Sequence, residues 1–290
     1  MELYRERTEG SRPRVFEILP LPTKRGIVAV LTGSLNRNML AHQFPEYCSD
    51  GNTICGTDLR HAKRTMEALV SDLEWPPGED VSDGVLFDLI EFFASRVATP
   101  KNQRWHDFMR HYELEFDERK GRSAFRDEIN EMLRAGATLF EITDQGKIER
   151  IGTPEVRAAL VDLQPDTGDE ELDALIVEAR ELFRSPKSQD RQSGLEKLWD
   201  AFERLKTIEP GKDKKAQVAA LLRRVDSEPL REKIDDEMVA LTKIGNEFRI
   251  RHHETDKHPV PRPEGQDYLF SRLATLVIYL LKISDRLKAD

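Results

Sequence analysis

The sequence predicts a mainly α-helical protein built from two domains. Its 290 residues exceed the usual size of one domain. Apolar residues recur at helical spacing in most segments, and this pattern is cleaner in the second half. A polar segment that contains Pro165 and Gly168 separates the halves. We therefore place an α-rich domain with a small β-hairpin at residues 1–165 and a helical bundle at 166–290.

Composition and charge narrow the class of protein. The chain has 45 Lys and Arg against 54 Asp and Glu, a net charge of −9. This composition excludes collagen, low-complexity disorder and a disulfide scaffold, and it argues against a generally basic protein that coats nucleic acid. Residues 201–290 carry 18 basic and 16 acidic side chains, so they repel an anionic partner less than the rest does.

The N-terminal half alternates predicted helices with turn-rich segments. Apolar spacing predicts helices at residues 59–73, 83–94, 105–114 and 123–135. Residues 26–31 predict a strand or a short helix, and the turn formers of residues 44–58 predict a loop. The segments 138–143 and 147–151 predict a β-hairpin, because they flank a short turn with a glycine.

A helix followed by a hairpin can be the recognition helix and wing of a DNA-binding module. Glu131, Asp144 and Glu149 would face a phosphate backbone unfavourably in such a module. We therefore favour a structural hairpin over a transcription regulator.

The C-terminal half predicts four long helices and one short one. Their apolar residues form stripes at i, i+3, i+4 and i+7, and short or polar segments separate them. The predicted helices cover residues 169–184, 189–207, 214–224, 229–248 and 266–287. This order indicates a helical bundle.

The two cysteines, the N-terminus and the longest apolar stretch indicate where the protein is located and whether it binds a metal. Cys48 and Cys55 are separated by six residues, which is not a zinc-knuckle spacing, so we interpret them as reduced thiols. The N-terminus lacks a signal-peptide pattern, and the apolar stretch 273–283 is too short to span a bilayer. We expect a cytoplasmic protein with no membrane association, no bound metal and no cofactor.

One polar segment stands apart at the predicted end of helix 229–248. Three of the seven histidines of the chain fall within seven residues there, beside arginines and carboxylates. Phosphate-cradling, dinucleotide-binding, serine-hydrolase and zinc-protease motifs are absent from the sequence. The candidate catalytic residues are Arg251, His252, His253 and His258, with Asn246, Arg249, Glu254 and Lys257 in support.

This set of residues suits the cleavage of RNA without a metal. Arginine holds a phosphate in a fixed geometry, and histidine exchanges protons near neutral pH. Two alternatives remain: the cations cap the helix C-terminus, or His252, His253, Asp256 and His258 hold a metal ion.

A second cluster of basic residues follows helix 189–207. It includes Lys206, and its candidate RNA-binding members are Lys212, Lys214, Lys215, Arg223 and Arg224. Such a cluster is either a surface that contacts phosphates or a solvated helix face.

The C-terminal half resembles the HEPN superfamily, and most closely the C-terminal domains of AbiJ-like abortive-infection proteins. The resemblance rests on residues 194–206, 244–254 and 267–272. The N-terminal half resembles the N-terminal domain of the same proteins at residues 44–48, 111–117, 121–122 and 146–150. In the family motif, four to six residues separate an Arg from a following His, and the six residues between Arg251 and His258 match this spacing.

The resemblance implies a metal-independent endoribonuclease that acts as a toxin or effector in antiphage defence. It implies RNA as the substrate, with tRNA as one candidate, and a homodimer formed through the C-terminal domain. It also implies an N-terminal domain that senses a trigger or binds a partner protein of the defence system. Some members of the superfamily lack catalysis, so the alternative is a non-catalytic module that binds RNA, an anion or a protein.

Overall fold

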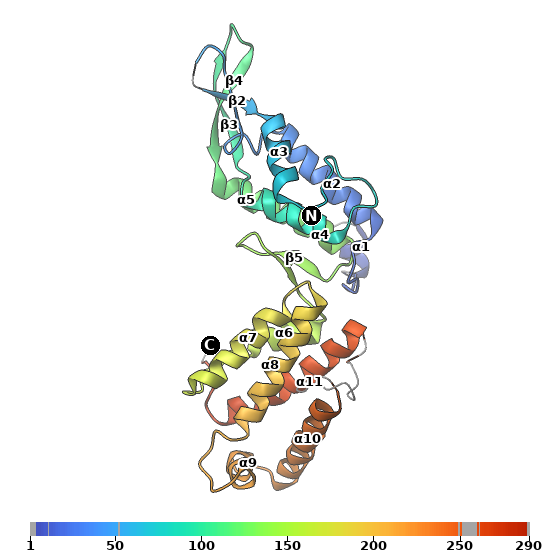
Figure 1. Cartoon of the computed structure of the whole chain (residues 1–290), viewed down its shortest axis with the longest axis vertical. Coiled ribbons are helices and arrows are strands. Elements are labelled where there is room, and N and C mark those ends of the chain that lie inside the picture. The colour runs from blue at the N-terminus through green and yellow to red at the C-terminus, as the bar shows by residue number, and fades with distance from the viewer. Residues whose placement is uncertain are drawn as a thin grey trace. The chain divides into compact units, whose positions relative to one another are not determined.

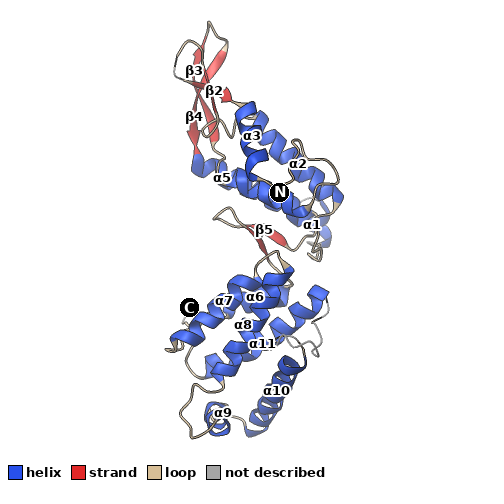
Figure 2. Ribbon diagram, viewed as in Figure 1, coloured by secondary structure: helices blue, strands red, loops and turns tan. Residues whose placement is uncertain are grey.

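The computed structural model describes residues 4–10, 12–51, 53–248, 250, 260 and 262–288, apart from the side chains of Arg5, Glu6 and Arg262. Helices dominate this part of the chain, which confirms the mainly α-helical prediction (Figure 2). The chain divides into two compact units, Met1–Glu149 and Arg150–Asp290. Figure 1 labels the elements of each unit.

The first unit has five helices among its described residues, and four of them, α2 to α5, share one apolar core. The helices are α1 (Tyr4–Glu9), α2 (Leu21–Asn36), α3 (Leu59–Leu69), α4 (Asp83–Ala94) and α5 (Glu118–Ala135). Asp58, Ser82 and Asp117 begin α3, α4 and α5, because each side chain accepts a hydrogen bond from a backbone N–H of the first turn. The helix α2 is longer than the segment 26–31 suggested, since Pro22 is compatible with a first helical turn.

The strands in the described part of the chain form three antiparallel hairpins. Their strands are β1 (Pro45–Tyr47) with β2 (Ile54–Thr57), β3 (Thr99–His106) with β4 (His111–Asp117), and β5 (Phe140–Ile142) with β6 (Ile148–Arg150). The predicted hairpin at residues 138–151 is confirmed. Asn130 of α5 fixes β5, because its side chain bonds both the N–H and the carbonyl of Ile142.

Two predictions for the first unit are wrong. Residues 105–114 belong to strands rather than to a helix, and residues 44–58 form a hairpin rather than a loop. The turn between β3 and β4 has no glycine or asparagine, and Arg110 takes the left-handed conformation there with φ 53°. The β3–β4 turn therefore lacks the sequence signal of a hairpin, whereas the β1–β2 connection contains Asp50-Gly51, a hairpin signal that our loop prediction did not use.

The second unit is a helical bundle. Its helices are α6 (Pro154–Asp162), α7 (Glu170–Phe183), α8 (Ser188–Leu205), α9 (Lys214–Leu222), α10 (Glu228–Glu247) and α11 (Arg262–Ile283). This confirms the five helices predicted after residue 166. Val156 and Leu160 of α6 lie in the same core as the later helices. The unit therefore begins at Arg150, before the boundary that we placed between residues 165 and 166.

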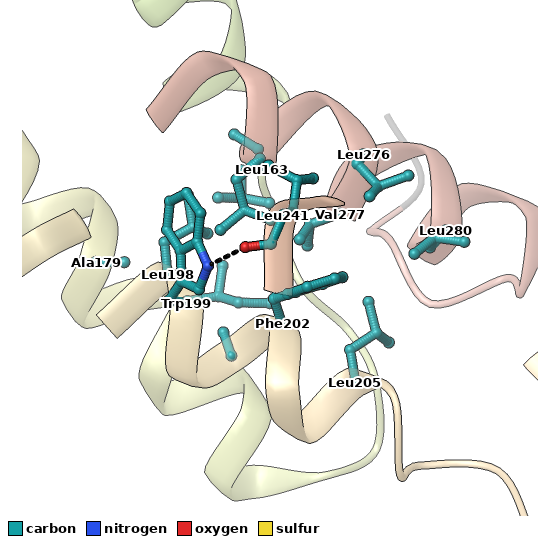
Figure 3. Close-up of a cluster of buried hydrophobic side chains, with 14 of the residues drawn as sticks. Leu163, Ala179, Leu198, Trp199, Phe202, Leu205, Leu241, Leu276, Val277 and Leu280 are labelled. Carbon is teal, nitrogen blue, oxygen red and sulfur yellow. Dashed lines mark hydrogen bonds between the residues drawn. The ribbon is translucent and has the colours of Figure 1, made fainter. Parts of the chain in front are cut away.

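Trp199 of α8 lies at the centre of the second core. Its side chain is fully buried, and its indole Nε1 donates a 3.1 Å hydrogen bond to the carbonyl of Leu241 in α10 (Figure 3). Gly245 lies one turn further along α10. A Cβ atom built at Gly245 would lie 2.3 Å from the indole Nε1, so only glycine allows this approach.

A buried ion pair joins the start of the second unit to α11. Arg150 is 1% exposed and donates two parallel hydrogen bonds to Asp267, at 3.0 and 2.7 Å. Such a pair stabilises little by itself, but the loss of one partner leaves a buried charge without compensation. The pair therefore fixes where α11 lies against the start of the unit.

Among the helices that the structure describes, none is both long and apolar enough to cross a lipid bilayer.

The first prediction concerns the glycine against Trp199. We expect Gly245→Ala to lower the free energy of unfolding by about 1–3 kcal/mol, because the added methyl group displaces the indole. Gly33→Ala, in the interior of α2, is the control: its nearest atom lies 4.0 Å away, so the change should be neutral or stabilising. Urea unfolding measures both, and equal stability of the two variants would contradict the packing argument.

The second prediction concerns pH. Asp169 begins α7, and hydrogen bonds from Arg204 lower the pKa of its carboxyl group. The ionised form therefore stabilises the fold above the ordinary carboxyl pKa of about 3.9, and this contribution is lost as the pH falls through the lower folded pKa. Asp169→Asn keeps a good N-cap but removes the charge. We expect the variant to be less stable than the wild type at pH 7 and the difference to shrink below about pH 4. A difference that persists unchanged at pH 2 in urea unfolding would refute the assignment.

Candidate functional site

The Arg- and His-rich segment connects α10 to α11. Most of its candidate residues lie outside the described residues: Arg249, Arg251, His252, His253, Glu254, Lys257 and His258. Asn246 is described, and it is exposed in the last turn of α10.

Both flanks are fixed to the core of the second unit. Ile250 is 1% exposed and belongs to the buried cluster, and its N–H bonds the carbonyl of Phe248. Val260 packs against the same cluster from the other side of the segment. The described residues on either side of 251–259, Ile250 and Val260, thus pack against one apolar core.

The first turns of α11, which follow this connection in the sequence, carry buried polar side chains. Gln266 and Asp267 are both buried. Gln266 donates a 3.3 Å hydrogen bond to Gln192 of α8, and Asp267 is held by Arg150. These contacts fix the first turns of α11, so the connection is followed at once by a rigid helix.

The predicted basic surface lies on α9 and beside it. Lys212, Lys214, Lys215, Arg223 and Arg224 are all exposed. Lys206 is different: it is buried, it bonds Glu203 and Thr242, and its ammonium lies 4.5 Å from the centre of the Phe202 ring. Lys206, which the sequence analysis grouped with the basic cluster, is therefore a buried residue and not part of the exposed basic surface.

Acidic residues compensate part of this surface. Lys214 pairs with Glu203 at 2.6 Å, and Arg224 lies 3.4 Å from Glu209. Burial opposes ionisation of Glu203, but hydrogen bonds from Lys206 and Lys214 outweigh it and lower the pKa of the carboxyl group. Within the described part of the chain, Lys212, Lys215 and Arg223 make no ion pair and remain available to a phosphate.

A groove between α9 and α10 adjoins these cations. It has a volume of about 700 Å³, and Val218, Leu222 and Val239 line its apolar floor. Lys215 and Arg223 border it, but so do Glu232 and Asp235. The groove is therefore mixed in charge, which gives only a weak electrostatic attraction for a nucleic-acid backbone.

A group in the first unit was missed by the sequence analysis. One ligand-type atom from each of Cys48, His106 and His111 lies within 4.8 Å of those of the other two. Both cysteines of the chain are free, as expected for reduced thiols. The sequence analysis predicted a helix at residues 105–114, and a helix does not pair His106 with His111. In the hairpin the two histidines are direct partners, and this pairing is what brings both of them near Cys48.

Comparison with protein-family models, curated proteins and solved structures finds no match to this chain.

The third prediction tests the basic surface. If α9 contacts RNA, the triple variant Lys212→Ala/Lys215→Ala/Arg223→Ala should bind RNA more weakly. The slope of log affinity against log salt should become less steep by about 2, because each phosphate contact on a single strand contributes roughly 0.7. Lys197→Ala is the control, since Lys197 lies on α8 and pairs with Glu178. Titrations of a labelled RNA over a range of salt concentrations measure both, and an unchanged slope in the triple variant excludes this surface.

Proposed function

We propose that the chain is a metal-independent endoribonuclease whose chemistry belongs to the connection between α10 and α11. The observation that carries the proposal is that the residues on both sides of this connection pack against the core of the second unit. An Arg- and His-rich segment is tied to the bundle core at Ile250 and Val260, and a rigid helix flanks it on each side. A catalytic segment benefits from such fixed ends, because phosphate and proton-transfer groups need a defined geometry.

The proposed reaction uses the ribose 2′-hydroxyl of the substrate as nucleophile. One histidine of the set His252, His253 and His258 removes the 2′-proton, and the oxygen attacks the adjacent phosphorus. Arg251 stabilises the charge that develops on the phosphoryl oxygens. The bond to the 5′-oxygen breaks, and this oxygen takes a proton from a second acid. The products are a 2′,3′-cyclic phosphate and a 5′-hydroxyl.

The biological setting follows from the same proposal. The enzyme would act on cellular RNA, tRNA included, as an effector of abortive infection in the cytoplasm. Two copies would dimerise through the second unit, so that two Arg/His segments face one substrate. The first unit would sense the trigger or bind a partner protein that restrains the nuclease.

A second candidate function is a non-catalytic module that binds RNA or a protein. The observation that favours it is the compensated charge of the basic surface, where Glu203 and Glu209 pair with Lys214 and Arg224. A module that recognises a protein would need less positive charge than one that follows an RNA backbone.

The fourth prediction separates these two functions. The purified chain should cleave total tRNA both in EDTA and in buffer without a chelator, and the products should carry 2′,3′-cyclic phosphate ends. Arg251→Ala and the double variant His252→Ala/His253→Ala should lose cleavage while keeping the wild-type unfolding transition.

Lys197→Ala is again the control, because its exposed pair on α8 plays no part in the proposed chemistry. Full cleavage by Arg251→Ala would exclude the proposed site. RNA binding without cleavage by the wild type would favour the non-catalytic module.

A further inference from the structure

The two hairpins β1–β2 and β3–β4 of the first unit bring three potential metal ligands together. Cys48 directly follows β1, and its N–H bonds the carbonyl of Thr53 across the hairpin. His106 ends β3 and His111 begins β4, and the two are direct partners in the strand register. The strands β2 and β4 are in contact (Figures 1 and 2). The thiol of one hairpin thereby comes close to the imidazoles of the other.

We infer that Cys48, His106 and His111 bind a zinc ion that links the two hairpins. The distance between Sγ of Cys48 and Nδ1 of His106 is 3.7 Å. Two ligands at zinc, with bonds of about 2.3 Å to sulfur and 2.0–2.1 Å to nitrogen at a tetrahedral angle, lie about 3.6 Å apart. The observed separation is close to that of two ligands on one ion.

His111 presents a nitrogen with a free lone pair to the group. Its Nδ1 lies 3.1 Å from the carbonyl oxygen of Tyr112, and because a carbonyl only accepts, this nitrogen carries the proton. The Nε2 atom must then be the acceptor. It is buried and has no hydrogen-bond partner among the residues that the structure describes. A hydrogen bond between the Cys48 thiol and the His106 imidazole leaves Nε2 of His111 without a partner, whereas a bound metal ion would give this nitrogen a partner.

Asp50 orients the ring of His106 so that its Nδ1 atom, rather than its Nε2 atom, faces the group. Its Oδ2 lies 3.4 Å from Nε2 of His106, so the proton on Nε2 faces a carboxylate and Nδ1 is left to face the thiol. The backbone N–H of Asp50 also donates a 3.4 Å hydrogen bond to Sγ of Cys48, so one short segment contacts both the thiol and His106. A carboxylate, a histidine and a metal commonly form such a chain.

The ligand types select the metal. One thiolate with two imidazoles suits zinc, whereas magnesium and calcium prefer oxygen ligands. Three protein ligands leave a fourth position for water or another small ligand. Cys55 does not belong to the group, because its thiol donates to the carbonyl of Glu46. Two-stranded hairpins are marginally stable alone, so an ion that joins two of them would stabilise this end of the first unit.

The test is zinc binding by the purified full-length chain, stripped of metal and titrated with Zn²⁺ against a chromophoric chelator. We expect one equivalent of zinc and a thermal midpoint that rises with zinc concentration. Cobalt(II), used as a spectroscopic probe, should give a thiolate charge-transfer band. Cys48→Ser and His111→Ala should abolish both signals, and Asp50→Ala should weaken zinc affinity by about 10–100-fold.

Cys55→Ser and His61→Ala are the matched controls and should bind zinc as the wild type does, since Cys55 bonds Glu46 and His61 is exposed on α3. A second measurement needs no variant: zinc should protect Cys48, but not Cys55, of the wild-type chain from alkylation. Absence of zinc binding, equal protection of both thiols, or binding of copper without zinc would each overturn the assignment. None of these readouts depends on ribonuclease activity, so the zinc site and the proposed function fail separately.

Discussion

The close approach of α10 to Trp199 is the constraint on which the second unit depends. The indole can bond the carbonyl of Leu241 only because Gly245 offers no side chain at the next turn. This contact fixes the C-terminal end of α10 against α8. Ile250, just beyond that end, is then held in the same core. The position from which the Arg- and His-rich connection starts is thus decided by packing several residues before it.

Buried charges organise the rest of this unit. Arg150 and Asp267 compensate each other fully, and Lys206 is compensated by Glu203 and by the hydroxyl of Thr242. Buried ion pairs contribute little net stability compared with apolar packing, but they penalise every arrangement that separates them. They therefore define one packing of α8, α10 and α11. The proposed ribonuclease chemistry benefits from this single packing, because Ile250 and Val260, which flank the Arg- and His-rich segment, pack against the same core.

The first unit shows a different division of roles. Its helices α2 to α5 share one apolar core, whereas the hairpins β1–β2 and β3–β4 have exposed residues along much of their length. Small sheets of this kind need another source of stability. The group of Cys48, His106 and His111 supplies one, if it holds zinc as we propose. A metal-linked tip would also give the first unit a rigid surface suited to a partner protein.

The sequence by itself determined most of the long helices, because an apolar stripe with period 3.6 is a local property that survives in most contexts. It also determined the hairpin at residues 138–151, whose turn carries a glycine. It singled out the Arg- and His-rich segment by composition alone. Only the tertiary structure decided the other two hairpins, the burial of Lys206 and the meeting of Cys48 with two distant histidines. The physical reason is that strand pairing, charge burial and ligand geometry depend on residues far apart in the chain, which no local pattern records.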